Sequence, residues 1–455
     1  MKVLMISANV TLYPYPVYPL GMSMVAAALS GAGHEVQQLD YLQQERSLES
    51  VLEEVKRFQP GMIGISVRNI DNVNLLNTEY YIHNVKNMVD AIRTVSDARI
   101  VLGGAGFSLI PEQILEETGA DFGVIGEGEQ LMVAFADGAE RGIYPQKRLL
   151  GPASPLSGDD IGSALYDEGL TRFYLQSGNI ASIQTKRGCS HHCVYCTYPL
   201  LEGSCLRSRD PVKVVDDIEL LRDKHGTGYI FFVDSVFNDD SGIYLGVVDE
   251  MLHRKVNIPW TGYIKPGNLN DEIVERMKST GFASAEVGSD AACDSTLARM
   301  GKDFTFADIR ECNDLLTRHG IATCHFFMFG GPGETEETVK EGIANILSLK
   351  KCVIFIFMGI RLLPNTPLAK IAVREGVIDS ESDMLQPVYY IAPNLDRDWL
   401  ERTLTEAFAG VRHCLFPPDC MDNCLNVLHK LGYSGPMWDL LTKEKPRRRG
   451  AHAAA

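Results

Sequence analysis

The sequence lacks the features that mark membrane, secreted and nucleic-acid-binding proteins. No stretch approaches the roughly 20 uninterrupted apolar residues of a membrane helix, and the opening MKVLMISANV has no signal-peptide cleavage site. The formal net charge is −16 and the pI is near 5.2, which argues against nucleic acid, because phosphate binding depends on clustered Lys and Arg. The one basic run, KPRRRG at 445–450, belongs to a tail that we expect to be disordered. We therefore expect a cytoplasmic protein with no membrane span and no nucleic-acid partner.

The length and the cysteine content set further limits. A chain of 455 residues with 45% hydrophobic residues has enough apolar surface for two or three globular domains. Its eleven cysteines are an odd number and few for this length, which argues against a disulfide framework. In a reducing compartment, clustered thiols indicate metal binding or catalysis, while isolated ones are small core residues. Four thiols in apolar surroundings are therefore expected to be structural, namely Cys293, Cys312, Cys324 and Cys352.

The first 145 residues alternate between strand and helix patterns. Apolar β-type runs occur at 2–8, 34–40, 62–67, 99–104 and 122–127, with helical patterns between them at 21–33, 48–57, 80–95 and 112–118. This order predicts an α/β domain with a doubly wound parallel sheet of the flavodoxin or Rossmann kind. Ligands of such sheets bind at the carboxyl ends of the strands, where this chain has SANV, SVRN, GGAGFS and GEGE. No G-x-G-x-x-G follows the first strand, so a dinucleotide is disfavoured, and GGAGFS is open to interpretation as a tight strand-to-helix turn.

A second alternating region follows a segment rich in Pro, Gly and Ser, which we interpret as a linker over 146–180. Strand patterns occur at 181–186, 229–234, 259–264, 284–289, 323–330 and 353–362, with helical patterns near 211–224, 241–253, 271–280, 305–319 and 334–349. Six strand–helix units over 181–380 predict a partial (β/α)6 barrel related to the TIM barrel, open on one side, with its chemistry at the carboxyl ends of the strands. The remaining residues, 381–455, are predicted to form a helical and loop extension that covers the barrel mouth.

Three cysteines follow the first predicted barrel strand in KRGCSHHCVYCTY, at Cys189, Cys193 and Cys196. Their C-x3-C-x2-C spacing differs from the paired C-x2-C units of a structural zinc site, and no fourth cysteine stands at a matching distance. Three thiolates on one loop can hold three irons of a [4Fe–4S] cluster and leave the fourth iron open. The alternative is zinc held by the three cysteines with His191 or His192.

These cysteines, with an aromatic residue before the last, resemble the signature of the radical S-adenosylmethionine (SAM) superfamily. Later segments are similar to its motifs in the same order: FFVDSVFN, GSDAACDSTLARMGKDFT, FFMFGGPGETEET and LLPNTPLAKIAVREG. The resemblance implies that Asp234 contacts the amino group of SAM and that Asp290, which stands where glutamate is usual, contacts its ribose. It also assigns Gly330, Gly331 and Pro332 to the SAM site.

The N-terminal half resembles the cobalamin-binding domain that precedes the barrel in the B12-dependent class. The classical D-x-H-x-x-G motif is absent, which within this class implies base-off cobalamin with no histidine below the cobalt. The alternative is a B12-like domain that has lost its ligand. The residues that the resemblance assigns to cobalamin are Asn9, Ser66, Val67, Gly103, Gly104, Ala105, Gly106, Gly126, Glu127 and Gly128. Among them, the glycines at 103, 104 and 106 are expected to let the corrin lie against the loop, so that Gly104→Val removes cobalamin and spares the cluster.

The resemblance implies an enzyme that uses a reduced [4Fe–4S] cluster and SAM to generate a 5′-deoxyadenosyl radical, which takes hydrogen from an unactivated carbon. C-methylation from methylcobalamin is the predicted outcome, and radical cyclisation, oxidation or rearrangement is the alternative. A cobalamin-binding module with a degenerate barrel is the hypothesis from a different class. The expected partners are a small-molecule substrate, with a lipid or hydrophobic natural product as candidates, and an external electron donor such as flavodoxin or ferredoxin.

A second group of cysteines occurs near the C-terminus, at Cys414, Cys420 and Cys424. An auxiliary iron–sulfur cluster uses such a set of thiols. However, no second motif of the superfamily accompanies them, and ordinary loop cysteines are the commoner interpretation.

Overall fold

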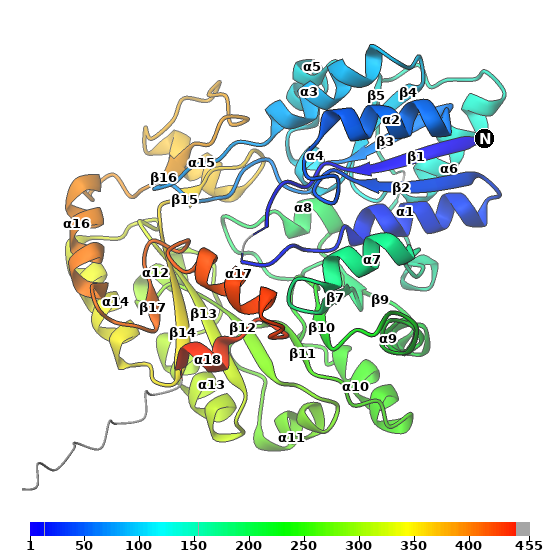
Figure 1. The fold of residues 1–455 in the computed structure, drawn as a ribbon. Helices are drawn as coiled ribbons and strands as arrows, with labels where there is room; N and C mark the ends of the chain where they lie inside the picture. The colour runs from blue at the N-terminus through cyan, green and yellow to red at the C-terminus, as the bar shows by residue number, and fades with distance from the viewer. Residues whose placement is uncertain (13, 153, 443–455) are drawn as a thin grey trace, which may run out of the picture.

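The N-terminal part of the chain folds into a six-stranded parallel sheet with helices on both faces (Figure 1). The computed structural model describes residues 1–12, 14–152 and 154–442, so the basic run at 445–450 lies outside the described residues. The strand order is β2-β1-β3-β4-β5-β6, and its first five strands follow the flavodoxin-like order, whose ligand site lies at the switch point between β1 and β3. The strands are β1 (Lys2–Ser7), β2 (Glu35–Asp40), β3 (Met62–Ser66), β4 (Arg99–Gly103), β5 (Phe122–Val124) and β6 (Leu149–Leu150).

Two groups of helices cover the two faces of this sheet. Helices α1 and α6 contact each other on one face, while α2, α3 and α5 contact one another on the other. Local sequence signals set the ends of these helices: Ser47 accepts a hydrogen bond from the N–H of Ser50 at the start of α2, and Gly119 ends α5 in the left-handed conformation. The helices are α1 (Leu20–Gly31), α2 (Leu48–Phe58), α3 (Ile82–Arg93), α4 (Ala105–Leu109), α5 (Pro111–Thr118) and α6 (Glu129–Glu140).

The segment predicted to be a linker, 146–180, is instead built into the fold. Its strand β6 pairs with β5, and it also contains η1 (Gly158–Asp160) and helix α7 (Glu168–Leu175). The buried hydroxyl of Tyr174 in α7 donates to Asp40, at 2.9 Å, and accepts from the amide of Asn9, at 3.3 Å. The Pro, Gly and Ser residues surround these short elements, and a strand of two residues is too short to produce a periodic pattern.

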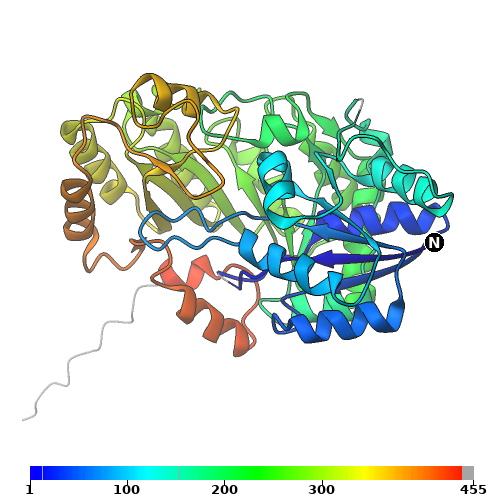
Figure 2. The same cartoon turned by 90° about the horizontal axis from the view of Figure 1, so that it is seen from above.

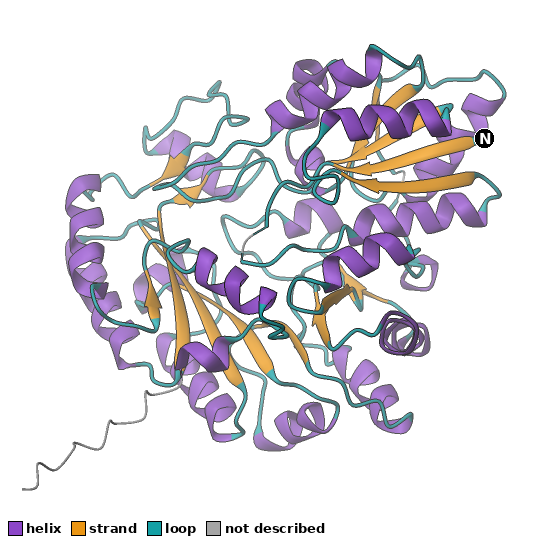
Figure 3. Ribbon diagram, in the orientation of Figure 1, coloured by secondary structure: helices purple, strands orange, loops and turns teal. Residues whose placement is uncertain are grey.

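The second part is an open barrel of seven strands in the order β17-β14-β13-β12-β11-β10-β7 (Figure 3). All of its pairs are parallel, and β7 and β17 form its two edges, so the predicted open side is present. The strands are β7 (Ile180–Ile183), β10 (Tyr229–Phe232), β11 (Trp260–Ile264), β12 (Ser284–Asp290), β13 (Ala322–Phe329), β14 (Cys352–Met358) and β17 (Cys414–Leu415). Two short hairpins accompany them, β8 (Lys186–Arg187) with β9 (Arg207–Ser208), and β15 (Ile360–Arg361) with β16 (Tyr389–Tyr390).

Helices alternate with the barrel strands, and five of them lie where the sequence predicted helices, whereas the shorter α8, α12 and α15 were not predicted. Helix α13 begins with a capping box, in which Thr305 and Asp308 bond reciprocally to each other's backbone N–H, and α9 begins with proline after the N-cap Asp210. The helices are α8 (Tyr198–Glu202), α9 (Pro211–His225), α10 (Tyr244–His253), α11 (Asp271–Ser279), α12 (Asp294–Arg299), α13 (Phe306–Arg318), α14 (Glu336–Ser348) and α15 (Pro367–Arg374).

The segment after 380 completes the barrel as well as covering it. Strand β17 extends the sheet by pairing with β14, with Cys414 opposite Ile354. Helix α18 contacts β13 and β14, and Figure 1 shows α17 and α18 in front of these strands. The helices of this segment are α16 (Arg397–Phe408), α17 (Asp422–Lys430) and α18 (Trp438–Thr442).

One hydrophobic core joins the two parts. It contains Met22 and Phe135 from the helices of the first sheet, Tyr174 from α7, and Ile183 and Phe232 from the barrel strands. Because buried apolar contacts run continuously from one sheet to the other, the two parts form a single body, seen from above in Figure 2. Within the described residues, every helix is too short or too polar to cross a bilayer.

Candidate functional site between the two sheets

The two sheets face one large cavity of about 1010 Å³. Its walls come from the carboxyl ends of β1, β3, β4 and β5 and from the interior of the barrel. Nine of the ten residues assigned to cobalamin line it: Asn9, Ser66, Gly103, Gly104, Ala105, Gly106, Gly126, Glu127 and Gly128. The tenth, Val67, is buried and is not among the lining residues; its carbonyl accepts the N–H of Gly106 at 2.9 Å.

The glycines at the end of β4 differ in whether the backbone requires glycine there. Gly104 has φ +96°, and a β-carbon there would lie 2.6 Å from the carbonyl oxygen of Val67, so the turn itself requires glycine. At Gly103, by contrast, a β-carbon would have only an ordinary contact, 3.7 Å from the carbonyl oxygen of Val124. This corrects the expectation that Gly104→Val removes cobalamin alone, because that substitution also strains the fold. Gly103 is the position where a side chain enters the cavity without disturbing the turn.

Glu127 and Glu129 connect the first sheet to the barrel by buried ion pairs. Arg187, in the hairpin before the cysteine loop, lies 3.0 Å from Glu127 and 2.5 Å from Glu129, and Arg207 in β9 lies 2.7 Å from Glu127. Burial alone would lower the pKa of Arg187, but the two carboxylates raise it. Glu127 therefore lines the cavity as predicted, and its carboxylate is already occupied by guanidinium groups.

The cysteine loop is held in place by backbone contacts. At Gly188, with φ +93°, a β-carbon would lie 2.1 Å from the carbonyl oxygen of Cys205, so the chain can enter the loop only with glycine here. The N–H of Cys189 donates to the carbonyl of Gly203 at 3.1 Å, and the N–H of Val194 donates to that of Met300 at 3.0 Å. The three thiols are therefore presented from a loop whose backbone is held by the chain's own hydrogen bonds.

The chemistry of the three thiols suits a multi-iron cluster. Burial raises the pKa of Cys193, and it raises that of Cys196 to about 12, so these thiols ionise only when positive charge lies beside them, which cluster iron supplies. A tetrahedral zinc ion with Zn–S bonds of about 2.3 Å requires sulfurs about 3.8 Å apart. Among the described residues, the cysteines do not form a set whose ligand atoms all lie within 4.8 Å of one another. A cluster spaces its cysteine ligands more widely than a single ion does, so the loop fits iron–sulfur chemistry better than zinc.

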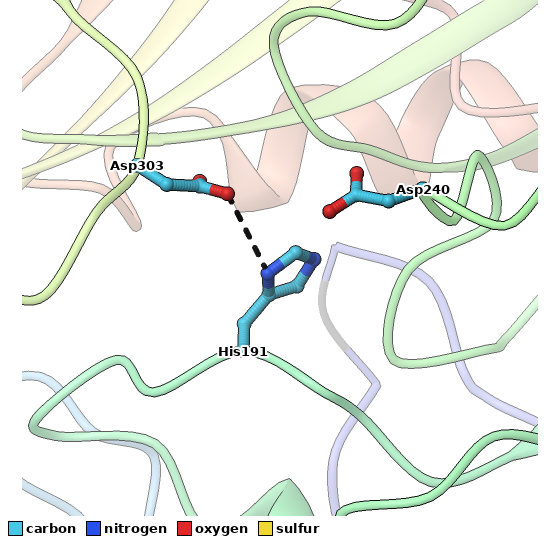
Figure 4. Close-up of side chains that lie close together, drawn as sticks. All are labelled: His191, Asp240 and Asp303. Atoms are coloured by element: carbon cyan, nitrogen blue, oxygen red, sulfur yellow. Dashed lines mark ion pairs between the residues drawn. The ribbon is translucent and has the colours of Figure 1, made fainter.

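The histidine nearest the alternative zinc site is engaged elsewhere. Nδ1 of His191 lies 4.0 Å from Asp303, and Figure 4 shows its ring between Asp303 and Asp240. Nζ of Lys265 binds both carboxylates, at 2.7 Å and 3.0 Å, and already balances much of their charge. We therefore interpret this exposed group as a surface ion-pair network.

Two of the predicted SAM segments lie next to the cysteine loop. Asp290 ends β12 with φ +62° and forms an ion pair with Lys302, whose ammonium also lies 5.4 Å from the ring centre of Tyr195. Burial alone would lower the pKa of Lys302, but Asp290, Tyr195 and Cys193 raise it well above its usual value. Asp290 has an unusual backbone conformation for a residue other than glycine, of the kind that is stabilised at functional sites.

The glycine segment after β13 lies on the same side. A β-carbon at Gly331 would lie 3.0 Å from Thr296 and 3.4 Å from the sulfur of Met300, the residue whose carbonyl binds the cysteine loop. The buried carboxylate of Glu334 accepts the N–H groups of Gly330 and Gly331, and burial raises its pKa to about 7. This segment, which includes Pro332, is therefore ordered close to the loop.

Asp234 follows strand β10, as predicted, but the chain's own groups already bind its carboxylate. Its side chain is fully buried, and its oxygens accept the N–H of Thr185 at 2.7 Å, the Thr185 hydroxyl at 2.5 Å and Nζ of Lys186 at 3.3 Å. A contact with the amino group of SAM requires an open oxygen, which this arrangement does not provide. The carboxylate instead fixes the turn between β7 and the cysteine loop, while Lys186 also lies 3.5 Å from Asp239.

The C-terminal cysteines are dispersed. Cys414 is buried in β17, whereas Cys420 and Cys424 are exposed, so the three thiols do not share one environment. Two residues of the cavity, Glu286 and Trp438, were not predicted from the sequence. Glu286 falls within an apolar strand pattern and Trp438 in the extension, and neither belongs to a motif.

Comparisons with known proteins agree with this geometry. Residues 6–136 match the B12 binding domain family and residues 183–344 match the Radical SAM superfamily. The tryptophan 2-C-methyltransferase of Streptomyces laurentii is 26% identical over 433 residues, covering 78% of this chain and 72% of that protein. The anaerobic magnesium-protoporphyrin IX monomethyl ester cyclase of Cereibacter sphaeroides is 25% identical over 347 residues, covering 71% of this chain and 55% of that protein.

A solved structure shares the whole fold. The radical SAM methyltransferase TsrM from Kitasatospora setae, with tryptophan and the SAM analogue aza-SAM bound, superposes with a TM-score of 0.85 at 23% identity and covers 97% of both chains. The two domain matches also occur in the order that the sequence predicted, on either side of one cavity. The chain therefore contains a B12 binding domain followed by a radical SAM domain, the combination that the sequence predicted for a cobalamin-dependent radical SAM enzyme.

Proposed function

We propose that the protein C-methylates a small molecule with the help of cobalamin, a [4Fe–4S] cluster and SAM. The observation that carries the proposal is the single cavity of about 1010 Å³ shared by the carboxyl ends of the first sheet and the barrel interior. The cavity reaches the segments on both sides of the cysteine loop through Arg187, Tyr198 and Glu202. Its lining does not include the proposed cluster and SAM residues themselves, which are Cys189, Cys193, Cys196, Asp290, Gly330, Gly331 and Pro332. Ligand cavities for one drug-sized molecule are about 300–1,000 Å³, so this cavity lies at the upper end of that range.

Small residues at the strand ends fit the proposed cobalamin site. Gly103, Ala105 and Gly126 leave the cavity wall flat, and the side chains of Asn9 and Ser66 supply polar atoms at the switch point between β1 and β3. Within the described residues no histidine lines the cavity, which agrees with base-off cobalamin that has no histidine below the cobalt.

The cysteine loop and its neighbours fit the other two cofactors. Cys189, Cys193 and Cys196 are the proposed iron ligands, and Asp290 and the segment 330–332 are the proposed SAM contacts. When bound, these cofactors supply a carbon-centred radical and a transferable methyl group. The chain's own contribution is to orient the thiols, to hold Lys302 beside Asp290 and Tyr195, and to exclude water with the segment around α18.

The remaining predictions belong to the same proposal. All eleven cysteines are free thiols, which supports a reducing cytoplasm as the location. A reduced cluster needs an external one-electron donor, for which flavodoxin or ferredoxin is the proposed partner. The similarity to a cyclase makes radical cyclisation a second candidate, with the same cofactors and a different fate of the substrate radical.

The test is anaerobic reconstitution with iron, sulfide, cobalamin, SAM and a reductant. We expect a base-off cobalamin spectrum, about four irons per chain and slow formation of 5′-deoxyadenosine, together with S-adenosylhomocysteine as the mark of methyl transfer. A variant with all three loop cysteines changed to alanine is the control for adventitious iron. S-adenosylhomocysteine formed equally well without cobalamin would contradict methylation through cobalamin, and failure to form either nucleoside would favour a binding module.

A further inference from the structure

The barrel interior contains one carboxyl group among aromatic side chains. On the cavity side of strands β10 to β14, Glu286 of β12 is the charged residue among the lining residues. It is paired in register with Tyr263 of β11 on one side and with Cys324 of β13 on the other. The aromatic residues that these strands contribute are Phe231, Tyr263, Phe326, Phe355 and Phe357.

One oxygen of Glu286 is bound and the other faces the cavity. Nε1 of Trp438 donates to Oε1 of Glu286 at 2.7 Å, and the side chain is only 2% exposed. In the part of the chain that the structure describes, no donor reaches Oε2. Oε2 is accessible from the cavity and can accept a hydrogen bond from a ligand donor. Burial raises the pKa of Glu286 to about 8, although the Trp438 bond opposes the rise.

The ionisable neighbours of Glu286 do not supply positive charge. Burial raises the pKa values of Tyr15, Tyr229, Tyr263 and Cys324, so all four remain neutral near pH 7. Among the described residues no cation forms an ion pair with Glu286, so the carboxyl group is largely protonated near pH 7 and becomes ionised when a ligand brings a positive group to it.

The aromatic walls suit a flat ligand with a positive group. Phe326 and Phe355 stack with ring centres 5.5 Å apart and planes at 18°, and Trp438 meets Phe355 edge-on at 5.5 Å. Phe231 and Tyr263 form another pair, at 5.2 Å. Ring faces attract both other rings and cations, and the attraction grows when water is excluded.

The arginines of the cavity are largely neutralised. Arg187 is paired with Glu127 and Glu129, and Nε of Arg361 lies 2.7 Å from Asp71. These pairs leave the cavity without a strong excess of positive charge, which disfavours recognition of an anionic substrate.

Acidic residues also line the cavity near the C-terminal segment. Asp419 and Asp422 both line it, and burial together with the charge of Asp419 raises the pKa of Asp422 to about 6. Glu79 lines it as well, whereas Arg68 is the cation on this surface without an ion-pair partner among the described residues. The negative potential that results favours the entry of cations.

We propose that the barrel side of the cavity binds an arylalkyl amine, with its ring between the aromatic walls and its protonated nitrogen on Oε2 of Glu286. This inference rests on the proposed function, in that the barrel interior is taken as the substrate site. It adds the chemical class of the substrate, which the sequence motifs do not contain.

The test compares three probes of similar shape on anaerobic protein loaded with the cluster and cobalamin. These are 2-phenylethylamine, the neutral 2-phenylethanol and the anionic 3-phenylpropionate, each titrated by calorimetry. We expect the amine to bind at least tenfold more tightly than the alcohol, and the acid to bind most weakly. Equal affinities for amine and alcohol, or preference for the acid, would overturn the proposal.

Glu286→Gln provides the matched variant. Its amide oxygen can keep the hydrogen bond from Trp438, so the NH2 group turns toward the cavity and repels an ammonium. We expect the preference for amine over alcohol to disappear while the affinity for the alcohol changes less than twofold. Asp422→Asn, which removes a charge elsewhere in the lining, should change the preference less than threefold. A preference that survives in Glu286→Gln would refute the assigned contact.

The measurements distinguish failure of the amine site from failure of the proposed function. Cobalamin binding is followed independently by its visible spectrum, and the same titrations are repeated on protein without cobalamin. Loss of amine preference with a normal base-off spectrum contradicts this inference alone. Absence of the base-off spectrum contradicts the proposed function, whichever probe binds.

Discussion

Replacing Gly103 by valine tests whether a flat ligand lies against the end of β4. Gly103 lines the cavity, and a β-carbon there meets the carbonyl oxygen of Val124 only at 3.7 Å, so the fold accommodates the change. Valine is also favoured in strands, which this residue ends. Its two methyl groups would occupy the space where we place the corrin.

The expected loss follows from the contacts that the side chain would displace. If about ten contacts between the corrin and the backbone are lost, each worth about 0.1–0.2 kcal/mol, binding weakens by about 1–2 kcal/mol, or about five- to thirty-fold. The assay is titration with hydroxocobalamin under anaerobic conditions, followed in the visible spectrum, with the melting temperature measured on the same samples. Gly162→Val is the control, because Gly162 is exposed and a β-carbon there would have no atom within 4 Å.

Gly104→Val distinguishes ligand contact from backbone strain. At φ +96° and 2.6 Å from the carbonyl oxygen of Val67, this variant should lose stability before it loses cobalamin selectively. Gly103→Val should instead keep the wild-type melting temperature and the cluster absorbance. Unchanged cobalamin affinity in a folded Gly103→Val protein would show that the corrin does not lie on this wall, and the reasoning would be wrong.

Three further predictions concern the barrel. Alanine at Cys189, Cys193 or Cys196 should abolish cluster absorbance and 5′-deoxyadenosine formation without unfolding the chain, and retained SAM cleavage in any of the three would refute the ligand assignment. Asp234→Ala should lower the unfolding free energy by about 3–5 kcal/mol in denaturant titrations, because it breaks a buried ion pair; an unchanged stability with weaker SAM binding would restore the role first predicted for it. The pKa of Glu286 is about 8 in the folded protein, against 4.5 for a free carboxyl. The protonated carboxyl therefore contributes fully to the free energy of unfolding below pH 4.5, and this contribution is lost as the pH rises through 8. From pH 5 to 8 the wild type should therefore lose about 3 kcal/mol relative to Glu286→Gln, and parallel stability curves would contradict this.

Long periodic elements were predictable from the sequence, whereas short ones were not. The five main strands of the first sheet, six strands of the barrel and its five longest helices lie within a few residues of the predicted positions, whereas the short helices α8, α12 and α15 were missed. Strand β6 and helix α7 were missed because Pro, Gly and Ser dominate their surroundings and each element is stabilised by contacts with distant residues. Strand β17 was missed for the same reason, since two residues have no detectable period.

The residues of the candidate site also differ in how far the sequence alone predicts them. The cysteine loop was recognisable because cluster chemistry imposes a fixed local spacing on it. Asp234 was placed correctly at a strand end, but burial and its bonds to Thr185 and Lys186 depend on the three-dimensional fold. Glu286 and Trp438 lie 152 residues apart in the sequence, so only the folded chain shows that they form one unit.

The carboxylates of Glu127 and Glu129 have a consequence for how such proteins can be recombined. A chimera that took its first 140 residues from a relative would leave Arg187 buried without a counter-ion unless the donor supplied acids at both positions. An uncompensated buried charge costs several kcal/mol, which is a large fraction of the stability of a typical domain. Laboratory exchange of the two halves should therefore succeed only when residues 127, 129, 187 and 207 are transplanted as a set, and a natural lineage that changed one of them would be under pressure to change its partners.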